Sequence, residues 1–309
     1  MKKMISVIIL DNTDRTYLVR CLNSLKRQIY NNVEIILVVN DSIAENTEDG
    51  MNNTFTSFSL EEITENIPLT VIHSPGSNRY SRINDALRAV NGDYIFFCSP
   101  LSVPAPNTFA ELLSTVEDNP FIFTCGCCYI PDVKGYKPYQ NMGTSLFGKL
   151  FSKELIVKNN IYLHENLVLA EYLFVAEYLH LFTDVNLNSN IYIYEMNAEY
   201  LEPGSYSDIS REEWAQIFHT LISGETASPA EHYMASSLKK YIERNQIDSV
   251  ELLYLAEEKI HGLYEVNYTL AQRTLPILWA DFIQSGEQEK LELFRNYLQK
   301  YDCFLLGTL

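Results

Sequence analysis

A short loop after a buried strand is the first place in this sequence where chemistry is expected. Residues 94–97 form an apolar and aromatic run between Gly92 and Pro100, which is typical of a strand buried on both faces of a parallel sheet. Ligands of open α/β sheets collect beyond the carboxyl ends of such strands. The residues at that end are Cys98, Ser99, Pro100, Leu101 and Ser102. None is a hard anionic ligand for a divalent cation, so the loop has the position of a binding site without metal ligands.

The cysteines are the next residues that could hold a metal. Three of the six fall within residues 125–128, directly after a strand-like run at residues 121–124. A structural zinc site needs two separated ligand pairs, and neither the other cysteines nor the histidines supply a second pair at a suitable spacing. We therefore expect buried, reduced thiols and no bound metal.

Composition and charge limit the classes of partner. The chain has 309 residues, of which 47% are hydrophobic and 20% charged, as in an ordinary globular protein. Its formal net charge is −17, and no basic stripe is visible in the sequence. Nucleic acid is therefore not expected as a partner, because a polyanion would be repelled.

No segment has the pattern of a membrane span or of a cleaved leader. The apolar run of residues 5–10 meets Asp11 and Asn12 too soon for a signal peptide. No apolar stretch is long enough to cross a bilayer. We expect a cytoplasmic location, with attachment to the inner face of the membrane only through a partner or a surface patch.

Strands and helices alternate in the first part of the chain, so that the predicted fold class is α/β with a mostly parallel sheet. Besides residues 94–97, buried strands are predicted at residues 5–10 and 33–39 and a further strand at residues 69–73, with helices at residues 17–29 and 81–90. A strand, a helix and a parallel strand form a right-handed unit, which places Leu10 and Val39 side by side on one edge of the sheet. The polar residues 46–66 are expected to form a surface excursion.

The carboxyl-terminal part has a different periodicity. Residues 210–213 form a capping box, and apolar stripes at helical spacing continue beyond it. The sequence predicts a first domain over residues 1–207 and an all-helical region over residues 208–309. The aromatic stripe of that region fits packing against the first domain, or docking of another protein or a membrane face.

The element order, together with particular residues, resembles the family 2 glycosyltransferases. The resemblance covers about residues 4–207, and the matching segments are residues 5–9, 17–25, 34–36, 84–97, 123–130, 147–155, 163–177 and 191–197. The later segments have counterparts in the bacterial branch that builds surface polysaccharides and decorates surface proteins. The resemblance implies the Rossmann-like, nucleotide-sugar-binding fold called GT-A, with UDP or another nucleotide carrying the sugar.

The resemblance also assigns nucleotide-binding candidates. Asn40 and Asp41 match the family's loop that holds the nucleoside, and Asp11 and Asn12 stand in an altered first loop. Asn84 and the collinear Ser99 complete the set. Asp41 and Asn84 equally suit helix caps or turns, and this alternative stays open.

The metal motif of the family is missing. Family members use an Asp-x-Asp after the strand to bind Mg²⁺ or Mn²⁺, which stabilises the charge of the leaving diphosphate. The collinear positions here are Ser99, Pro100 and Leu101. We expect no metal site and no metal cofactor, although the family implies one.

The base and a late cation are also replaced. Tyr172 occupies the place of the family's catalytic aspartate, and a phenol with a pKa of about 10 is a poor general base at neutral pH. Glu171 is the second catalytic candidate, but it could replace Tyr172 as the base only if the backbone were rotated by one residue, because neighbours on a helix face different ways. A solvated or capping carboxylate is the simpler expectation for Glu171. Glu195 stands where the family has an arginine, and would repel a diphosphate. Lys149 could contact a phosphate, but a surface lysine is the simpler expectation.

Three functions follow from these residues, and whether the chain is an enzyme stays open. The leading hypothesis is a catalytically degenerate glycosyltransferase that acts as a partner or regulator in bacterial glycan assembly, with another glycosyltransferase or a membrane-associated complex. The second is an active, metal-independent transferase with a sugar-nucleotide donor. The third is an interaction module with a plugged pocket.

Overall fold

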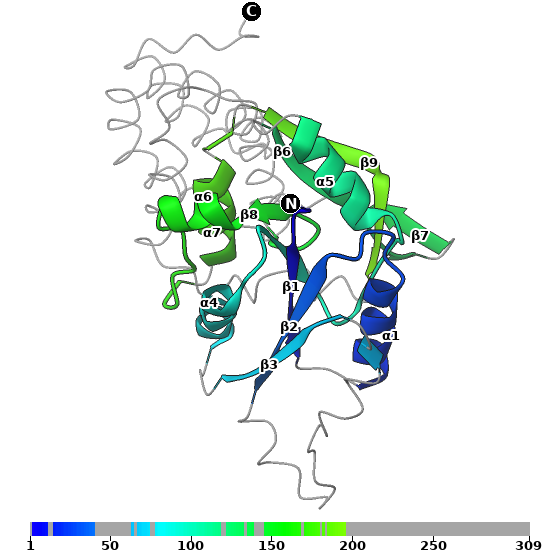
Figure 1. Ribbon diagram of the computed structural model, residues 1–309, viewed down its shortest axis with the longest axis horizontal. Coiled ribbons are helices and arrows are strands. Elements are labelled where there is room, and N and C mark those ends of the chain that lie inside the picture. Colours follow the sequence, from blue (N-terminus) through cyan, green and yellow to red (C-terminus); the bar gives the residue numbers. More distant parts are fainter. Residues whose placement is uncertain are drawn as a thin grey trace, which may run out of the picture.

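The computed structural model describes most of the first 195 residues of the chain (Figure 1). The described ranges are residues 2–11, 15–40, 63–64, 67–74, 78–118, 122–132, 135–138, 145–167, 170–179, 181–182 and 184–195. The predicted helical region of residues 208–309 and nearly all of the polar excursion lie outside these ranges. The division into two domains therefore remains a prediction.

The first sheet has five strands in the order β3-β2-β1-β4-β8. Their bounds are β1 Ile5–Asp11, β2 Val33–Asn40, β3 Leu69–Ser74, β4 Tyr94–Cys98 and β8 Leu150–Ser152. All neighbours are parallel except β8, which pairs antiparallel with β4. Leu10 pairs with Val38 and Asp11 with Val39, which confirms that β1 and β2 end on the same edge.

The central strands β1, β2 and β4 form where the sequence is mainly apolar, because both faces of the sheet are covered there. In β4 the residues from Ile95 to Cys98 are all buried, as predicted for a central strand. The covering helices are α1 Arg15–Lys26, α4 Arg79–Ala89, α5 Thr108–Asp118, α6 Lys153–Lys158 and α7 Ala170–Leu179. In Figure 1, α4, α6 and α7 gather on one side of β1, and α1 lies on the other. None of the described helices has the length and apolar content needed to cross a bilayer.

Both predicted helices have boundaries that differ from the observed ones. The first helix ends at Lys26 rather than at residue 29, and Ile29 is 72% exposed, so the apolar residue there does not continue the buried stripe. The helix predicted at residues 81–90 begins two residues earlier, at Arg79. It starts there because the side chain of Asn78 caps it, accepting hydrogen bonds from the backbone N–H groups of Tyr80 and Ser81.

The sequence did not predict a second sheet, of order β5-β9-β6-β7. Its strands are β5 Ser102–Pro104, β6 Ile122–Asp132, β7 Gly135–Pro138 and β9 Asp184–Glu195. β6 extends well beyond the predicted run of residues 121–124 and incorporates the cysteine cluster as strand residues. Cys125, Cys21 and Cys98 are buried and form no disulfide, which agrees with the expectation of buried, reduced thiols for these three residues.

An aromatic cluster joins the two sheets. Phe97 of β4 packs against Phe151 of β8, and Phe151 contacts Phe123 of β6, with ring centroids 5.7 and 5.9 Å apart. Tyr178 of α7 lies against both Phe123 and Phe151. The core is therefore continuous from one sheet to the other, and β8 lies at the junction.

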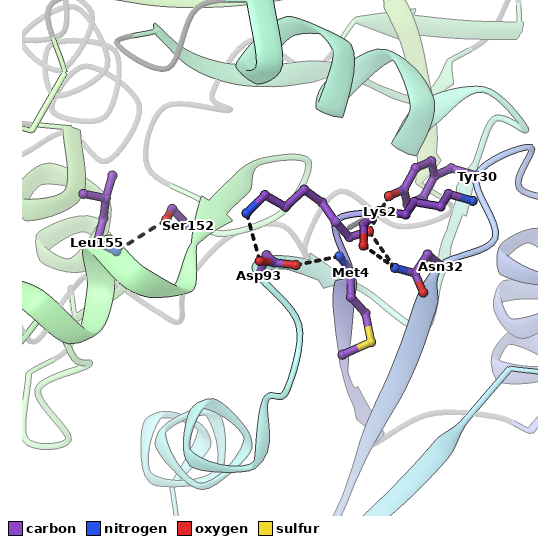
Figure 2. A network of polar contacts seen from close by, with 8 residues as sticks. Lys2, Met4, Tyr30, Asn32, Asp93, Ser152 and Leu155 are labelled. Atoms are coloured by element: carbon purple, nitrogen blue, oxygen red, sulfur yellow. Dashed lines mark hydrogen bonds and ion pairs between the residues drawn. The ribbon is translucent and has the colours of Figure 1, made fainter.

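A polar network closes the amino-terminal edge of the first sheet. Buried Glu34 accepts hydrogen bonds from the Ser6 hydroxyl and from the backbone N–H groups of Asn91 and Gly92. Figure 2 shows the neighbouring contacts at the start of β1, where Asp93 accepts from the Met4 N–H at 2.9 Å. These contacts hold the start of β1 and the turn before β4 in register.

Candidate functional site

The candidate site lies at the opposite edge, where β1, β2 and β4 end. The strands finish at Asp11, Asn40 and Cys98, and parallel register brings these ends together. Of the predicted nucleotide-binding residues, Asp11 is the last residue of β1, whereas Asn12 and Asp41 lie outside the described residues. The backbone at this edge thus has the placement that ligands of α/β sheets use.

The loop after β4 is a closed, buried turn. The Ser99 hydroxyl accepts a hydrogen bond from the Leu101 N–H at 3.1 Å, and the Ser99 carbonyl accepts from the Ser102 N–H at 2.9 Å. All three residues are buried. The single hydroxyl at the expected metal position is therefore used inside the turn.

This donor set does not fit a divalent cation. Mg²⁺ and Mn²⁺ favour carboxylate and carbonyl oxygens, whereas the turn presents an engaged hydroxyl, a proline ring and a leucine side chain. Within the described part of the chain, histidine, cysteine and carboxylate side chains form no cluster of three that could hold a metal ion.

Two thiols pack against the same turn. The Sγ atoms of Cys21 on α1 and Cys98 on β4 lie 3.6 Å apart, and both are buried. Each thiol also donates to the Ser99 carbonyl, at 3.5 Å from Cys21 and 3.6 Å from Cys98. The thiols therefore pack and orient the turn.

Glu171, in the first turn of α7, is fully buried, which contradicts the solvated carboxylate and leaves the capping alternative of that expectation open. Its Oε1 accepts a hydrogen bond from Arg79 Nε at 2.8 Å. Its Oε2 is buried and has no hydrogen-bonding partner in the structure as described. Tyr172 is the next residue of α7, and its side chain is not among those that the structure describes. One potential base is thus held as the counter-ion of a buried pair.

Arg79 is a site residue that sequence reasoning missed. Its guanidinium carbon lies 5.6 Å from the ring centroid of Phe147. The backbone of Phe147 forms a bridge with Phe97 of β4, so Arg79 lies near the end of β4. The side chain is 26% exposed, so one part reaches solvent at this edge. A pairing across 92 residues leaves no local pattern in the sequence, and only the fold could reveal it.

Asn84 contacts the protein backbone through both ends of its amide. Its Nδ2 donates to the Leu163 carbonyl at 2.8 Å, and its Oδ1 accepts from the Leu163 N–H at 3.0 Å. Nδ2 also lies 3.3 Å from Glu165 Oε1. Asn84 thereby ties α4 to the segment that leads into α7.

Two further residues have positions that bear on the site. Glu195 is the last residue of β9, and its backbone pairs with Ser102 directly after the candidate loop. Lys149 is fully buried, which contradicts the expected surface lysine. Its Nζ donates to the Ser145 carbonyl, and its backbone bridges to Cys125 of β6. The apolar residues on both sides of Gly148 and Lys149 were the signal for burial.

Comparison with solved structures finds the same architecture in glycosyltransferases. S. aureus TarS 1-349 in complex with UDP-GlcNAc is 14% identical, with a TM-score of 0.62 over 96% of this chain and 91% of that chain. The mannosyltransferase PcManGT from Pyrobaculum calidifontis, in complex with GDP-Man and Mn²⁺, is 12% identical, with a TM-score of 0.54 over 98% and 85%. At these identities the likeness shows the GT-A fold.

Sequence comparison identifies the family. No curated protein matches the chain. The family model described as Glycosyl transferase family 2 matches residues 6–168, which is more than half of the chain and includes β1, β2, β4 and the candidate loop. The predicted resemblance is confirmed, and the chain belongs to glycosyl transferase family 2.

Proposed function

We propose that this protein binds a sugar nucleotide at the carboxyl edge of β1, β2 and β4 without a divalent cation on the loop after β4. We further propose that it has lost transfer activity and serves as a partner or regulator in bacterial glycan assembly. The observation that carries this proposal is the buried turn of Ser99, whose hydroxyl is bound to the Leu101 N–H. The structural neighbours that carry UDP-GlcNAc or GDP-Man support the ligand class.

The state of the base supports the loss of transfer. Proton removal from an acceptor hydroxyl needs a base that can reach the hydroxyl and whose pKa is near the working pH. Tyr172 is a phenol, and Glu171 is buried against Arg79. Neither residue meets both requirements, so a bound donor would persist without being transferred.

A second function, metal-independent transfer, is favoured by Arg79. A guanidinium can bind a diphosphate in bidentate fashion, and Arg79 brings its charge to the same edge as the candidate loop. In this alternative, Arg79 supplies part of the positive charge that a metal supplies elsewhere. The Arg79→Lys variant would keep the charge and lose the fork geometry, so weaker binding in that variant favours this alternative.

The deciding experiment is calorimetric titration of UDP, UDP-GlcNAc and GDP-Man into the protein, with EDTA and separately with Mn²⁺. The proposal expects specific binding of one nucleotide class that is equal in both conditions. Binding that requires Mn²⁺ would overturn the metal-free site. If none of the three nucleotides binds, the third function, an interaction module with a plugged pocket, is favoured.

A parallel assay for transfer and for donor hydrolysis separates the first two functions. The degenerate protein is expected to release no free sugar and to form no glycoside from a bound donor. If the wild-type protein turns over a donor, and Tyr172→Phe or Ser99→Ala abolishes this turnover, the proposed loss of transfer activity is refuted. Turnover that is unaffected by EDTA and lost in Arg79→Lys would establish the metal-independent enzyme.

A further inference from the structure

A second cleft lies between α4, α6 and residues 160–167, with a volume of about 840 Å³. Its walls include Leu87 and Arg88 from the last turn of α4 and Lys153 from the first turn of α6. The Lys153 N–H donates to the Asp93 carbonyl just before β4 begins. The cleft therefore reaches the amino-terminal end of the sheet. The nucleotide candidates Asp11 and Ser99 lie at the carboxyl end, whereas the candidate Asn84 lines this cleft.

The lining of this cleft is half apolar and half polar. Leu87, Ile156 and Ile161 supply the apolar part. Tyr162 is 46% exposed, and its ring packs on the imidazole of His164 with centroids 4.8 Å apart, which leaves an aromatic surface at the cleft. His164 is in turn 3.8 Å from Glu177, so the platform is anchored to α7.

Planar polar groups surround the aromatic platform. Asn160, Glu165 and Asn166 are exposed and line the cleft. Amides offer both donors and acceptors, and a carboxylate accepts two hydrogen bonds, which suits vicinal hydroxyl groups that donate and accept at once. An aromatic ring provides an apolar surface of fixed shape for the C–H face of a pyranose. The volume is in the range of small-molecule sites.

The charges in the cleft argue against a phosphate-bearing ligand. Arg88 is paired with Asp85 at 2.5 Å, and the Lys153 ammonium donates to the Val90 carbonyl at 2.6 Å. Both cations thus have partners within the protein, and Glu165 adds a negative charge nearby. A neutral ligand rich in hydroxyl groups matches the cleft better than a nucleotide or an acyl chain.

We infer that the cleft between α4 and α6 is an accessory carbohydrate-binding site that takes a short, neutral segment of a glycan chain. The inference rests on the proposed role in glycan assembly, but the site is separate from the nucleotide edge. It would hold a growing or modified glycan on the face behind the donor pocket. The Asn84 amide and Glu165 form part of its wall and also join α4 to the segment before α7.

The test is binding of neutral oligosaccharides by the full chain. Chito-, manno-, malto- and galacto-oligosaccharides are screened on an array, and any that bind are titrated by calorimetry. The variants are Tyr162→Ala and Asn166→Ala, with Tyr17→Ala as the matched control, because Tyr17 is a similarly exposed tyrosine on α1. Circular dichroism checks that each variant folds.

Oligosaccharide affinity is expected to fall about tenfold in Tyr162→Ala, the loss expected for one aromatic contact, and to stay unchanged in Tyr17→Ala. Tyr162→Phe should keep most of the affinity because the ring remains. Failure of every oligosaccharide to bind, or binding that neither Tyr162→Ala nor Asn166→Ala weakens, overturns the inference. UDP titration of the same samples judges the nucleotide site separately, so that either proposal can fail without the other.

Discussion

Arg79 of α4 and Glu171 of α7 form an ion pair between the first turns of two helices, with Arg79 Nε 2.8 Å from Glu171 Oε1. A carboxylate in a first turn is favoured by the helix dipole, whereas a cation there is disfavoured. Glu171 therefore suits its helix, and Arg79 does not suit its own. The placement of Arg79 is explained by its partner and by the edge of the sheet that it faces.

Removal of Arg79 should destabilise the protein because Glu171 would be left buried and uncompensated. We expect Arg79→Met to lower the free energy of unfolding by about 3 kcal/mol, toward the low end for buried pairs since Arg79 is partly exposed. Glu171→Gln should cost less, about 1 kcal/mol, because the amide can still accept from Arg79. Urea unfolding measures both.

The double variant Arg79→Met with Glu171→Gln is the control for this pair. Its destabilisation should be clearly smaller than the sum of the single values, since neither charge is then left alone. Additive single values would show that the two side chains do not interact in solution.

Substitution of Asn84 distinguishes a structural role from nucleotide binding. Asn84→Asp keeps the acceptor for the Leu163 N–H but loses the donor to the Leu163 carbonyl and faces Glu165. We expect a loss of about 2 kcal/mol of stability. UDP affinity, measured by calorimetry below the unfolding range, should change by less than about twofold. A tenfold loss of UDP affinity at unchanged stability would assign Asn84 to the nucleotide instead.

The parallel sheet could be predicted because its main strands can each be recognised from a short segment of the sequence. The central strands contain long apolar runs, and a run such as residues 35–39 needs no distant partner to be recognised. The second sheet could not, since β9 is polar through Asn186 and Asn188 and becomes a strand by pairing with β6. Its existence depends on contacts that no local window contains.

The position of the candidate loop could be predicted from the sequence, whereas the contacts of its side chains could not. Ser99 and Leu101 could be identified by their position after β4, and the structure adds that the serine hydroxyl is used in the turn. Arg79 carried no signal of its role, because its partner Glu171 is 92 residues away in the chain.

Glu34 should make stability depend on pH in the acidic range. Burial alone would raise the pKa of Glu34, but hydrogen bonds from Ser6, Asn91 and Gly92 outweigh it and hold the pKa below its ordinary value. A carboxyl whose pKa is lowered by folding stabilises the protein above its unfolded pKa of about 4.3, and this contribution is lost as the pH falls through the folded pKa. Glu34→Gln should remove it.

The measurement is the unfolding free energy of wild type and Glu34→Gln from neutral pH down to about pH 3. The difference between them should be largest near neutrality, about 2 kcal/mol, and should shrink below about pH 4. The lowered pKa of Asp93, which accepts from the Met4 N–H, contributes equally to both proteins. A difference that stays constant with pH would contradict an ionised, hydrogen-bonded Glu34.

Gly92→Ala should destabilise the turn before β4. A Cβ at this position would lie 2.6 Å from Ser6 Oγ and 2.8 Å from the Met4 carbonyl oxygen, and real Cβ atoms do not approach so closely. We expect a loss of roughly 1–3 kcal/mol, measured by thermal or urea unfolding. Repeating the change in a Ser6→Ala background removes the hydroxyl but leaves the backbone contacts. Most of the loss should therefore remain, and full rescue would locate the clash at the hydroxyl alone.

The antiparallel pairing of β8 with β4 also has a consequence during synthesis on the ribosome. β1 can pair with β2 as soon as both have emerged, and β4 then adds to β1. The other edge of β4, with its run of buried aromatic residues, stays open until Leu150–Ser152 leaves the exit tunnel. An open apolar edge can pair with another nascent chain. The residues between β4 and β8 thus set the time over which this edge of the nascent sheet stays unpaired.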